Sequence, residues 1–276
     1  MVKKAILPIA GLGTRFFPLS KTLPKEFLPL DSKPVIHYVV EEAIQAGVKE
    51  FIFVISPEKK EIFRKYILEY FVKEKGKLMK ILKERKKEEA ISTLKSIPKI
   101  KWKVVVQKEP KGDGDAILRA EKFIKKEPFL VLFGDDLSFG KKCFPLQLVE
   151  AYEKYKKPIL CLYRMPKKAL SDYGVPKVKR IRGKVYRILD IVEKPKENPP
   201  SSFALVGNYL LTPEIFKFLK KTPFFKGELI LANALRKMIE EGKEILGLEV
   251  SGKWLECGDL KKWMKSFLFL ARKRVI

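Results

Sequence analysis

The stretch Ala10–Leu30 gathers the residue types that bind phosphates. Its sequence, AGLGTRFFPLSKTLPKEFLPL, places two glycines shortly before Arg15 and Lys25. Glycines let the backbone approach a ligand and expose N–H donors, which suit phosphate oxygens. The planar guanidinium of Arg15 can grip two oxygens, and Lys25 adds a point charge on a loop stiffened by prolines. A turn with surface cations is the alternative, but the combination favours a phosphate site.

The two glycines do not complete a known nucleotide fingerprint. Phe16 stands where a GxGxxG motif needs its last glycine, and no GK[ST] follows as in a Walker A loop. The stretch therefore disfavours a dinucleotide cofactor and leaves a phosphate loop of another kind.

Two adjacent carboxylates, Asp135 and Asp136, follow the apolar run Phe129–Phe133. Carboxylates at a strand end suit Mg²⁺, which prefers hard oxygen ligands and keeps several waters. Successive side chains of an extended chain point to opposite sides, so only one of the two can face a common site. We expect Asp135 to bind the metal; a turn cap beside a solvated carboxylate is the alternative.

Two more strand ends carry polar side chains. The amide of Gln107 can donate and accept at once, as an imide such as uracil requires, although an ordinary loop capped by Asp113 also fits. Glu193 could accept bonds from sugar hydroxyls and Lys194 could hold a sugar phosphate; taken alone, the two also fit a surface ion pair.

Nucleophilic and zinc chemistry are disfavoured by the remaining inventory. The one histidine, His37, lies between apolar residues of an expected helix. Cys143, Cys161 and Cys257 are far apart and form no CxxC pair, which indicates core thiols and a cytoplasmic setting. Glycines, cations and carboxylates remain, and these are what phosphoryl and nucleotidyl transfer require.

The chain of 276 residues carries a net charge of +26. Such an excess suggests an anionic partner, which could be nucleic acid, a membrane surface or a phosphorylated small molecule. The basic residues are spread along most of the chain, which disfavours nucleic acid as the main partner. No apolar run reaches the ~18 residues that a membrane span needs.

Short apolar runs alternate with amphipathic segments, which predicts an α/β fold with a doubly wound sheet and helices on both faces. Strands are expected at Lys4–Ile9, Phe51–Ile55, Lys103–Gln107, Phe129–Phe133, Pro158–Tyr163, Tyr186–Glu193, Leu205–Leu211 and Ile245–Val250. Helices are expected at Lys33–Ala46, Pro57–Phe71, Asp113–Ile124, Pro145–Lys156, Glu228–Glu240 and Asp259–Arg272. Such sheets bind ligands beyond the carboxyl ends of their strands, where the candidate residues lie.

A basic segment at 73–100 interrupts this rhythm. It is expected to be helical to about Leu94, and Pro98 then ends the helical pattern. The segment predicts a surface insertion or a contact with another subunit.

In order along nearly the whole chain, the motifs resemble those of sugar-1-phosphate nucleotidylyltransferases. The PKEFLPL block and the KPVIHYVVEEA helix are the most specific, followed by QKEPKGDGDA, LFGDD, SDYGV, VEKP, ALVGNYLL, GELILANAL and LECGD. Within this family the chain is most similar to bacterial UTP–glucose-1-phosphate uridylyltransferases. The resemblance implies a single domain over 1–276 with a Rossmann-like, mixed and mainly parallel sheet, the nucleotide-diphospho-sugar transferase fold.

The resemblance also implies an activity: UTP and glucose 1-phosphate would give UDP-glucose and pyrophosphate with Mg²⁺. Homodimers or homotetramers are implied too, with the insertion at 73–100 and the helix near 259–272 as candidate contacts. The implied nucleotide-binding backbone is that of Ala10, Gly11, Leu12 and Gly13, and the implied phosphate-binding side chains are Arg15 and Lys25. Gln107 and Gly112 would contact the base, and Gly174, Glu193, Lys194 and Gly207 would contact the sugar phosphate. Asp135 and Glu256 would be the two metal ligands.

Three departures from the family pattern affect these expectations. Glu256 replaces the usual Asp of the second metal ligand, so its carboxylate must sit differently or act through water. Asp113 and Asp115 replace an apolar residue and a His beside the base site, which leaves the choice among UTP, dTTP and CTP open. Ala232 and Asn233 stand where Thr and Asp are common, which puts sugar contacts there in doubt.

Overall fold

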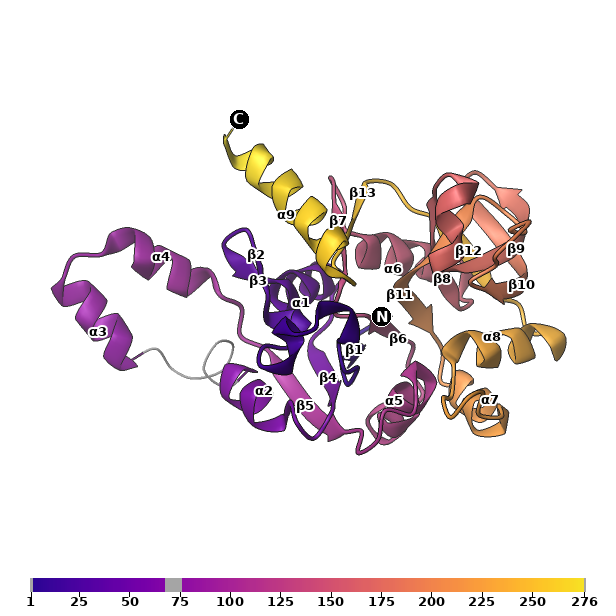
Figure 1. Cartoon of the computed structure of the whole chain (residues 1–276), viewed down its shortest axis with the longest axis horizontal. Coiled ribbons are helices and arrows are strands. Elements are labelled where there is room, and N and C mark those ends of the chain that lie inside the picture. Colours follow the sequence, from indigo (N-terminus) through magenta and orange to yellow (C-terminus); the bar gives the residue numbers. More distant parts are fainter. Residues whose placement is uncertain (1, 68–75, 276) are drawn as a thin grey trace.

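The computed structural model describes residues 2–67 and 76–275, and a nine-stranded sheet forms the centre of this part of the chain (Figure 1). The strand order is β5-β4-β1-β6-β11-β8-β12-β10-β9. The bounds along the sheet are Lys101–Val106, Glu50–Ile55, Lys4–Pro8, Phe129–Leu132, Phe203–Leu211, Ile159–Arg164, Leu246–Glu249, Val185–Glu193 and Gly174–Arg182.

The sheet is mixed and mainly parallel, as predicted. Strands β5, β4, β1 and β6 run parallel to one another, and β8 and β12 form another parallel pair. Strand β11 is antiparallel to both β6 and β8, and β10 is antiparallel to β12 and β9. Only β11 and β10 therefore oppose the common direction in this sheet, and most strands deliver their carboxyl ends to one edge.

Helices cover both faces of the sheet because its central strands are apolar on both sides. In β1, Ala5 and Leu7 join the core under α1 and α6, whereas Ile6 joins the core under α5, α7 and α8. Strand β4 divides in the same way, with Phe53 on one side and Ile52 on the other. The covering helices are α1 (Val35–Gln45), α6 (Phe144–Tyr155), α5 (Asp113–Arg119), α7 (Ile215–Lys221) and α8 (Leu231–Glu240).

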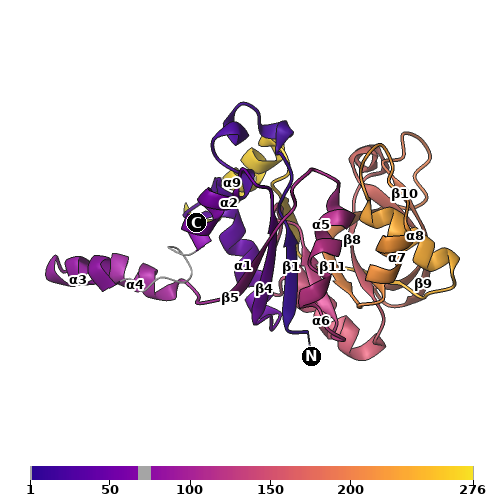
Figure 2. The ribbon, with the colours of Figure 1, turned by 90° about the horizontal axis from the view of Figure 1, so that it is seen from below.

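The basic insertion forms two short helices, α3 (Gly76–Glu84) and α4 (Glu88–Ser96), where a single helical pattern was expected. The pair projects from the body in both ribbon views (Figures 1 and 2). Helix α2 (Lys60–Ile67) begins later than the expected Pro57, and the rest of that predicted helix, 68–71, lies outside the described residues, as does 73–75 of the insertion.

The C-terminal helix and two pairs of short strands lie outside the nine-stranded sheet. Helix α9 (Leu260–Val275) confirms the predicted C-terminal helix and begins after the short strand β13 (Lys253–Glu256), which pairs with β7 (Asp136–Phe139). Strand β2 (Pro29–Leu30) pairs with β3 (Lys33–Pro34).

The start of the first helix was predicted wrongly. The helix expected from Lys33 begins at Val35, because the backbone of Lys33 bonds to Leu30 and Pro34 is still extended. Tertiary pairing thus overrides the preference of proline for a first helical turn. No strand or helix was predicted at β7, β9, β13 or α7.

The histidine and the thiols are structural, as predicted. His37 is buried on α1, and its Nε2 lies 2.8 Å from Glu41 Oε1. The three cysteines are free and buried, and burial raises the pKa of Cys143 to about 12. Among the described helices, none is long and apolar enough to cross a membrane.

Candidate active site

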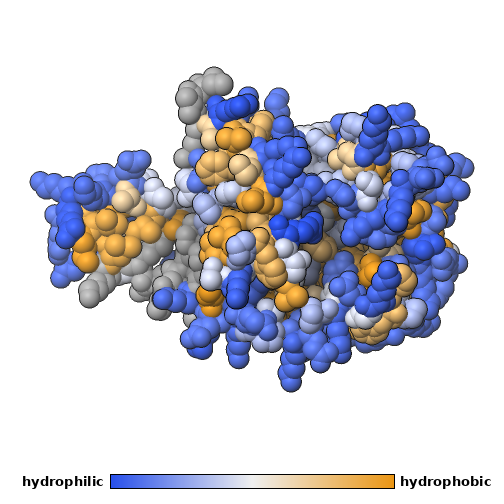
Figure 3. Space-filling view, viewed as in Figure 1, coloured by the Kyte–Doolittle hydropathy of each residue, from blue (hydrophilic) through white to orange (hydrophobic). Residues whose placement is uncertain are grey.

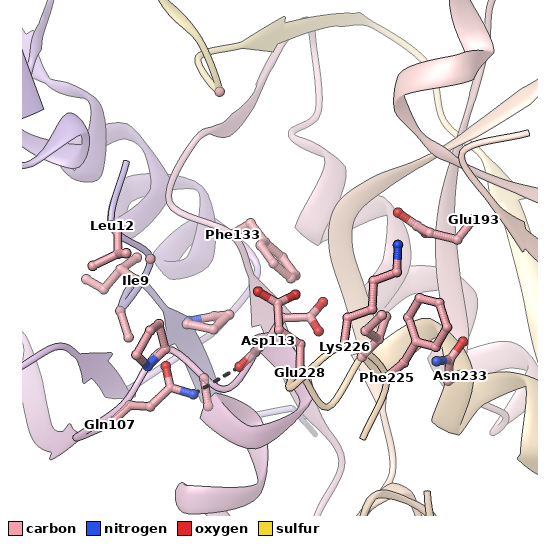
Figure 4. A pocket seen from close by; sticks show the side chains of 18 of the residues that line it. Ile9, Leu12, Gln107, Asp113, Phe133, Glu193, Phe225, Lys226, Glu228 and Asn233 are labelled. Carbon is pink, nitrogen blue, oxygen red and sulfur yellow. Dashed lines mark hydrogen bonds between the residues drawn. The ribbon is translucent and has the colours of Figure 1, made fainter. Parts of the chain in front are cut away.

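A cavity of about 1520 Å³ opens beyond the carboxyl ends of the strands and gathers most of the predicted residues (Figure 4). The predicted residues that line it are Ala10, Gly11, Leu12, Gly13, Arg15, Lys25, Gln107, Gly112, Asp135, Glu193 and Lys194. Three predicted residues, Gly174, Gly207 and Glu256, lie outside the lining but contact or adjoin residues of the site.

Lys25 and Asp135 form an ion pair in the lining of this cavity. Lys25 lies in a short 3₁₀ helix (Lys25–Phe27) and Asp135 follows β6, so 110 residues of sequence separate them. Burial alone would lower the pKa of Lys25, but the Asp135 carboxylate, with help from Glu26, holds it above its ordinary value. Burial likewise opposes ionisation of Asp135, yet Lys25 and Arg15 keep its pKa low. Both groups are therefore charged at neutral pH.

A second, buried ion pair anchors the loop that carries Lys25. Glu26 is 1% exposed, and its carboxylate accepts bonds from Lys59 Nζ at 3.1 and 3.3 Å. The same ammonium donates to the carbonyl of Ile9 at 2.9 Å, so it ties the loop to the residue that follows β1. A side chain at Gly134 would meet Ile9 and Glu26 within 3.0 Å, which explains the glycine before Asp135.

The glycines of the first loop differ in why they are needed. Gly13 has a positive φ of 68°, and its carbonyl accepts a bond from Ser20 Oγ at 2.7 Å, so the turn itself requires it. An added Cβ at Gly11 would meet nothing within 4 Å. The protein leaves this space open on the cavity side, which suits close approach of a ligand to the backbone.

The side chains of Asp135 and Asp136 diverge, as the sequence predicted. Asp136 turns inward, where Oδ1 accepts from Trp254 Nε1 at 2.8 Å and Oδ2 from the Gly207 N–H at 3.1 Å. Burial, with the charges of Asp135 and Glu256, raises the pKa of Asp136 to about 8. Any Cβ at Gly207 would collide with Asp136 Oδ2 at 2.3 Å. Gly207 thus supports Asp136 from behind and does not line the cavity.

Glu256 faces the same space as Asp135 next to Gly258. A Cβ placed at Gly258 would lie 3.2 Å from Asp135 Oδ2 and 3.6 Å from Glu256 Oε1. Two carboxylates on one space are the hard oxygen donors that Mg²⁺ prefers, so the residues fit that ion. Glu256 also accepts from Lys262 Nζ at 2.7 Å and from the Tyr173 hydroxyl at 2.5 Å.

At the other wall, Gln107 and Gly112 lie together. Gln107 Nε2 donates to the Gly112 carbonyl at 3.0 Å, and Figure 4 shows this bond. Gly112 has a φ of 90° and could not hold a side chain, because an added Cβ would lie 2.5 Å from the carbonyl of Leu229. Asp113 Oδ1 accepts from the N–H of Leu231, which joins this loop to α8.

The opposite end of the cavity is formed by Glu193, Lys194 and a loop that the sequence did not mark. Gly174 pairs with Glu193 across β9 and β10, and its missing side chain makes room for Glu193 Oε2. Burial raises the pKa of Glu193, while Lys194 opposes that shift. In Figure 4 the ammonium of Lys226 points toward Glu193, and Phe225 lies beside it.

Lys226 and Gly227 form a two-residue turn between Phe225 and Glu228, whose backbones bond to each other at 2.8 and 3.0 Å. Lys226 and Gly227 both have positive φ there. The sequence signal for the turn was the Lys-Gly pair alone, which does not reveal a cavity wall.

The glycine loop supplies cations beside a carboxylate that can bind a metal ion, and polar side chains further along the cavity can bind a second ligand. This arrangement is that of an α/β enzyme that transfers a phosphate-containing group. The sequence profile of the nucleotidyl transferase family matches residues 4–273, and the chain belongs to that family.

Relatives and solved structures extend over nearly the whole chain. A UTP–glucose-1-phosphate uridylyltransferase of Streptococcus pyogenes is 36% identical over 99% of this chain and 91% of its own length. The crystal structure of a UDP-glucose pyrophosphorylase with UDP-glucose has a TM-score of 0.87 at 34% identity, covering 99% of this chain and 100% of that chain. The UTP-bound enzyme from Acinetobacter baumannii has a TM-score of 0.86 at 29% identity, covering 98% and 93%.

Proposed function

We propose that this protein transfers UMP from UTP to glucose 1-phosphate, giving UDP-glucose and pyrophosphate. The similarity to uridylyltransferases over nearly the full chain supports this activity. The single structural observation that carries it is the Lys25–Asp135 ion pair, which lies beside Arg15 of the glycine loop in a cavity that Glu193 and Lys194 also line. A nucleoside triphosphate on the glycine loop and a sugar phosphate at Glu193 and Lys194 would share this cavity.

Different residues bind the two substrates and stabilise the transition state. The backbone of Ala10–Gly13 and the guanidinium of Arg15 bind the triphosphate, and Glu193 with Lys194 holds the sugar phosphate. A phosphate oxygen of glucose 1-phosphate attacks the α-phosphorus of UTP in line, and the bond from that phosphorus to the β-phosphate oxygen breaks. The attacking oxygen is already anionic, so no general base is needed. Lys25 stabilises the charge that the α-phosphate develops in the transition state.

Asp135 and Glu256 would hold Mg²⁺, with Asp135 as the direct ligand. The ion would neutralise phosphate charge and so lower the repulsion between the two anionic substrates. The extra methylene of Glu256 lets its carboxylate reach both Lys262 and the space beside Gly258, which supports contact with the ion through water.

Steady-state rates test this proposal against its nearest alternative, the same chemistry on another base or sugar. UTP, dTTP and CTP would each be assayed with a panel of sugar 1-phosphates and Mg²⁺, and pyrophosphate release would be measured. The highest kcat/KM is expected for UTP with glucose 1-phosphate. A higher value for another pair would move the proposal to that nucleotide or sugar. No release with any pair, together with salt-dependent binding to nucleic acid, would favour a non-catalytic binding protein.

A homodimer or homotetramer in the cytoplasm completes the proposal. Exposed apolar side chains lie on α3 and α9, including Leu78, Met264 and Leu268, each 50% exposed. Figure 3 shows hydrophobic surface over both regions. Light scattering on the purified protein measures the oligomeric state, and a monomer at all concentrations would remove this part of the proposal.

A further inference from the structure

The amide of Gln107 is held in one orientation by two acceptors. Its Nε2 donates to the Gly112 carbonyl at 3.0 Å and to Asp115 Oδ2 at 2.7 Å. A carbonyl and a carboxylate oxygen only accept, so the NH₂ end of the amide must face them. Gln107 is 4% exposed, which leaves its side chain little room to turn. Both amide hydrogens are therefore engaged by the protein.

The carboxylate that orients Gln107 is itself fixed. Arg119 lies one helical turn further along α5, and its Nε donates to the same Asp115 Oδ2 at 2.7 Å. The Asp115 side chain is 11% exposed and that of Arg119 is 34% exposed. Because the Arg119 guanidinium also binds this oxygen, the Asp115 carboxylate is held in a fixed position relative to the Gln107 amide.

The engaged NH₂ group leaves only Oε1 for a ligand. In the described part of the chain, Oε1 receives no hydrogen bond, and Gln107 lines the cavity. Figure 4 shows this oxygen pointing away from the bond to Gly112, on the side of Ile9 and Leu12 of the glycine loop. The Gln107 side chain therefore offers the cavity a hydrogen-bond acceptor, Oε1, and no donor.

We propose that Asp115 is a positioning residue that keeps the Gln107 oxygen toward the base and thereby selects uracil or thymine over cytosine. Uracil and thymine present a ring N3–H donor, whereas cytosine presents an unprotonated N3 that would face Oε1 lone pair to lone pair. A freely rotating glutamine could serve both bases by turning its amide. This inference deepens the proposed nucleotidyl transfer and depends on it for the identity of the ligand.

Substitution of Asp115 tests whether the orientation of the Gln107 amide determines the selectivity for the base. The ratio of kcat/KM for UTP to that for CTP, each with glucose 1-phosphate, is expected to exceed one in the wild-type protein. In Asp115→Ala this ratio should fall about three- to tenfold, because one of the two bonds that orient the amide is lost. The KM for glucose 1-phosphate should not change. If the alanine variant fails to fold, Asp115→Leu replaces the volume without the acceptor.

Two further variants control the interpretation. Asp115→Asn retains an oxygen that Arg119 can orient, so it should keep most of the selectivity. Glu109→Gln changes an exposed carboxylate earlier in the same loop, whose partner is Lys111, and should leave the ratio as it is. A loss of selectivity as large in Glu109→Gln as in Asp115→Ala would overturn the assignment.

Calorimetric binding of UTP and CTP in the absence of sugar phosphate provides a second measure. The wild-type protein should bind UTP more tightly, and the difference should shrink in Asp115→Ala. Equal affinities in the wild type, or an unchanged difference in the variant, would refute the role of Asp115. If UTP is selected over CTP but no pyrophosphate is released with glucose 1-phosphate, the proposed function fails and the orientation of Gln107 stands.

Discussion

At the end of the cavity that we propose for the nucleotide, the side chains of Lys25 and Asp135 are 15% and 14% exposed. At the end proposed for the sugar, those of Lys194 and Glu193 are 64% and 42% exposed, and their closest charged atoms lie 3.9 Å apart. Buried pairs support the neighbours of the first group: Lys59 binds Glu26, the residue after Lys25, and Asp115 binds Gln107. The second group is supported mainly by the strand pairing that places Glu193 beside Gly174.

The difference indicates which end is organised before a ligand binds. Charges and dipoles held in place by buried contacts stabilise a transition state without reorganising during the reaction. Exposed side chains lose conformational freedom when a ligand binds, which reduces the affinity that each contact supplies. We therefore expect substitutions at the nucleotide end to have large effects, and those at the sugar end smaller ones.

The largest expected effect is on stability, from the pair behind Lys25. Lys59→Met leaves the Glu26 carboxylate buried without its partner and should lower the free energy of unfolding by about 3–5 kcal/mol. Lys142→Met is the matched control, because Lys142 and its partner Glu150 are about half exposed; it should lower that free energy by about 0–1 kcal/mol. Denaturant titration measures both, and similar losses in the two variants would contradict the comparison.

Lys25→Ala should reduce kcat about 10²- to 10³-fold, the range found when one preorganised donor is removed from a transition state. Lys21→Ala removes an exposed lysine from the same loop and should leave kcat nearly unchanged. Circular dichroism would establish that both variants are folded. Near-normal turnover in Lys25→Ala would remove Lys25 from the catalytic group.

A pH effect is expected from Glu42, a buried residue of α1. Burial raises the pKa of Glu42 to about 8, although its Oε1 accepts from the N–H of Ser138 at 2.7 Å. Between its unfolded pKa near 4.5 and about 8, the folded protein keeps a proton that the unfolded chain releases. The contribution of Glu42 to stability should therefore fall as pH rises through this window, by at most about 1.4 kcal/mol per pH unit.

Glu42→Gln removes this titration. Unfolding free energies measured from pH 4.5 to 9 should show a shallower decline in the variant, and the difference from wild type should level off above pH 8. Parallel curves for the two proteins would mean that Glu42 ionises normally in the folded state.

The smallest expected effect is at the sugar end. Glu193→Gln weakens a half-exposed contact and should raise the KM for glucose 1-phosphate about tenfold, as expected for one hydrogen bond to a charged group. The KM for UTP should stay the same. Glu197→Gln, in the exposed loop beyond Lys194, is the control. A larger loss of kcat than in Lys25→Ala would reverse the comparison.

The central strands were predictable because burial on both faces makes them continuously apolar, as in Phe129–Leu132. Strand β9 was not predictable, because it lies at an edge of the sheet and four of its nine residues, GVPKVKRIR, are basic. Helix α7 is only seven residues long, which is too short for its helical periodicity to be recognised in the sequence. The strand-end rule found Gln107, which directly follows β5, and Asp135, which lies three residues beyond β6.

The residues that the rule missed lie elsewhere. Lys59 precedes α2 and Lys226 lies in a tight turn, and neither is marked by a strand end. Asp115 was identified as a departure from the family pattern, but its bond to Gln107 depends on how α5 packs against β1 and β4. These partners could be found only from the folded chain.

The sequence by itself determined the chemical inventory, the apolar strands and the order of the main elements, because local patterns of burial fix them. Only the tertiary structure decided which charges meet. With 59 lysines and arginines and 33 acidic residues, the sequence permits very many ion pairs. Packing of β1, β6 and the loops between them selects Lys25 with Asp135 and Lys59 with Glu26. The physical reason is that a buried charge requires a partner at hydrogen-bonding distance, and only the three-dimensional fold sets that distance.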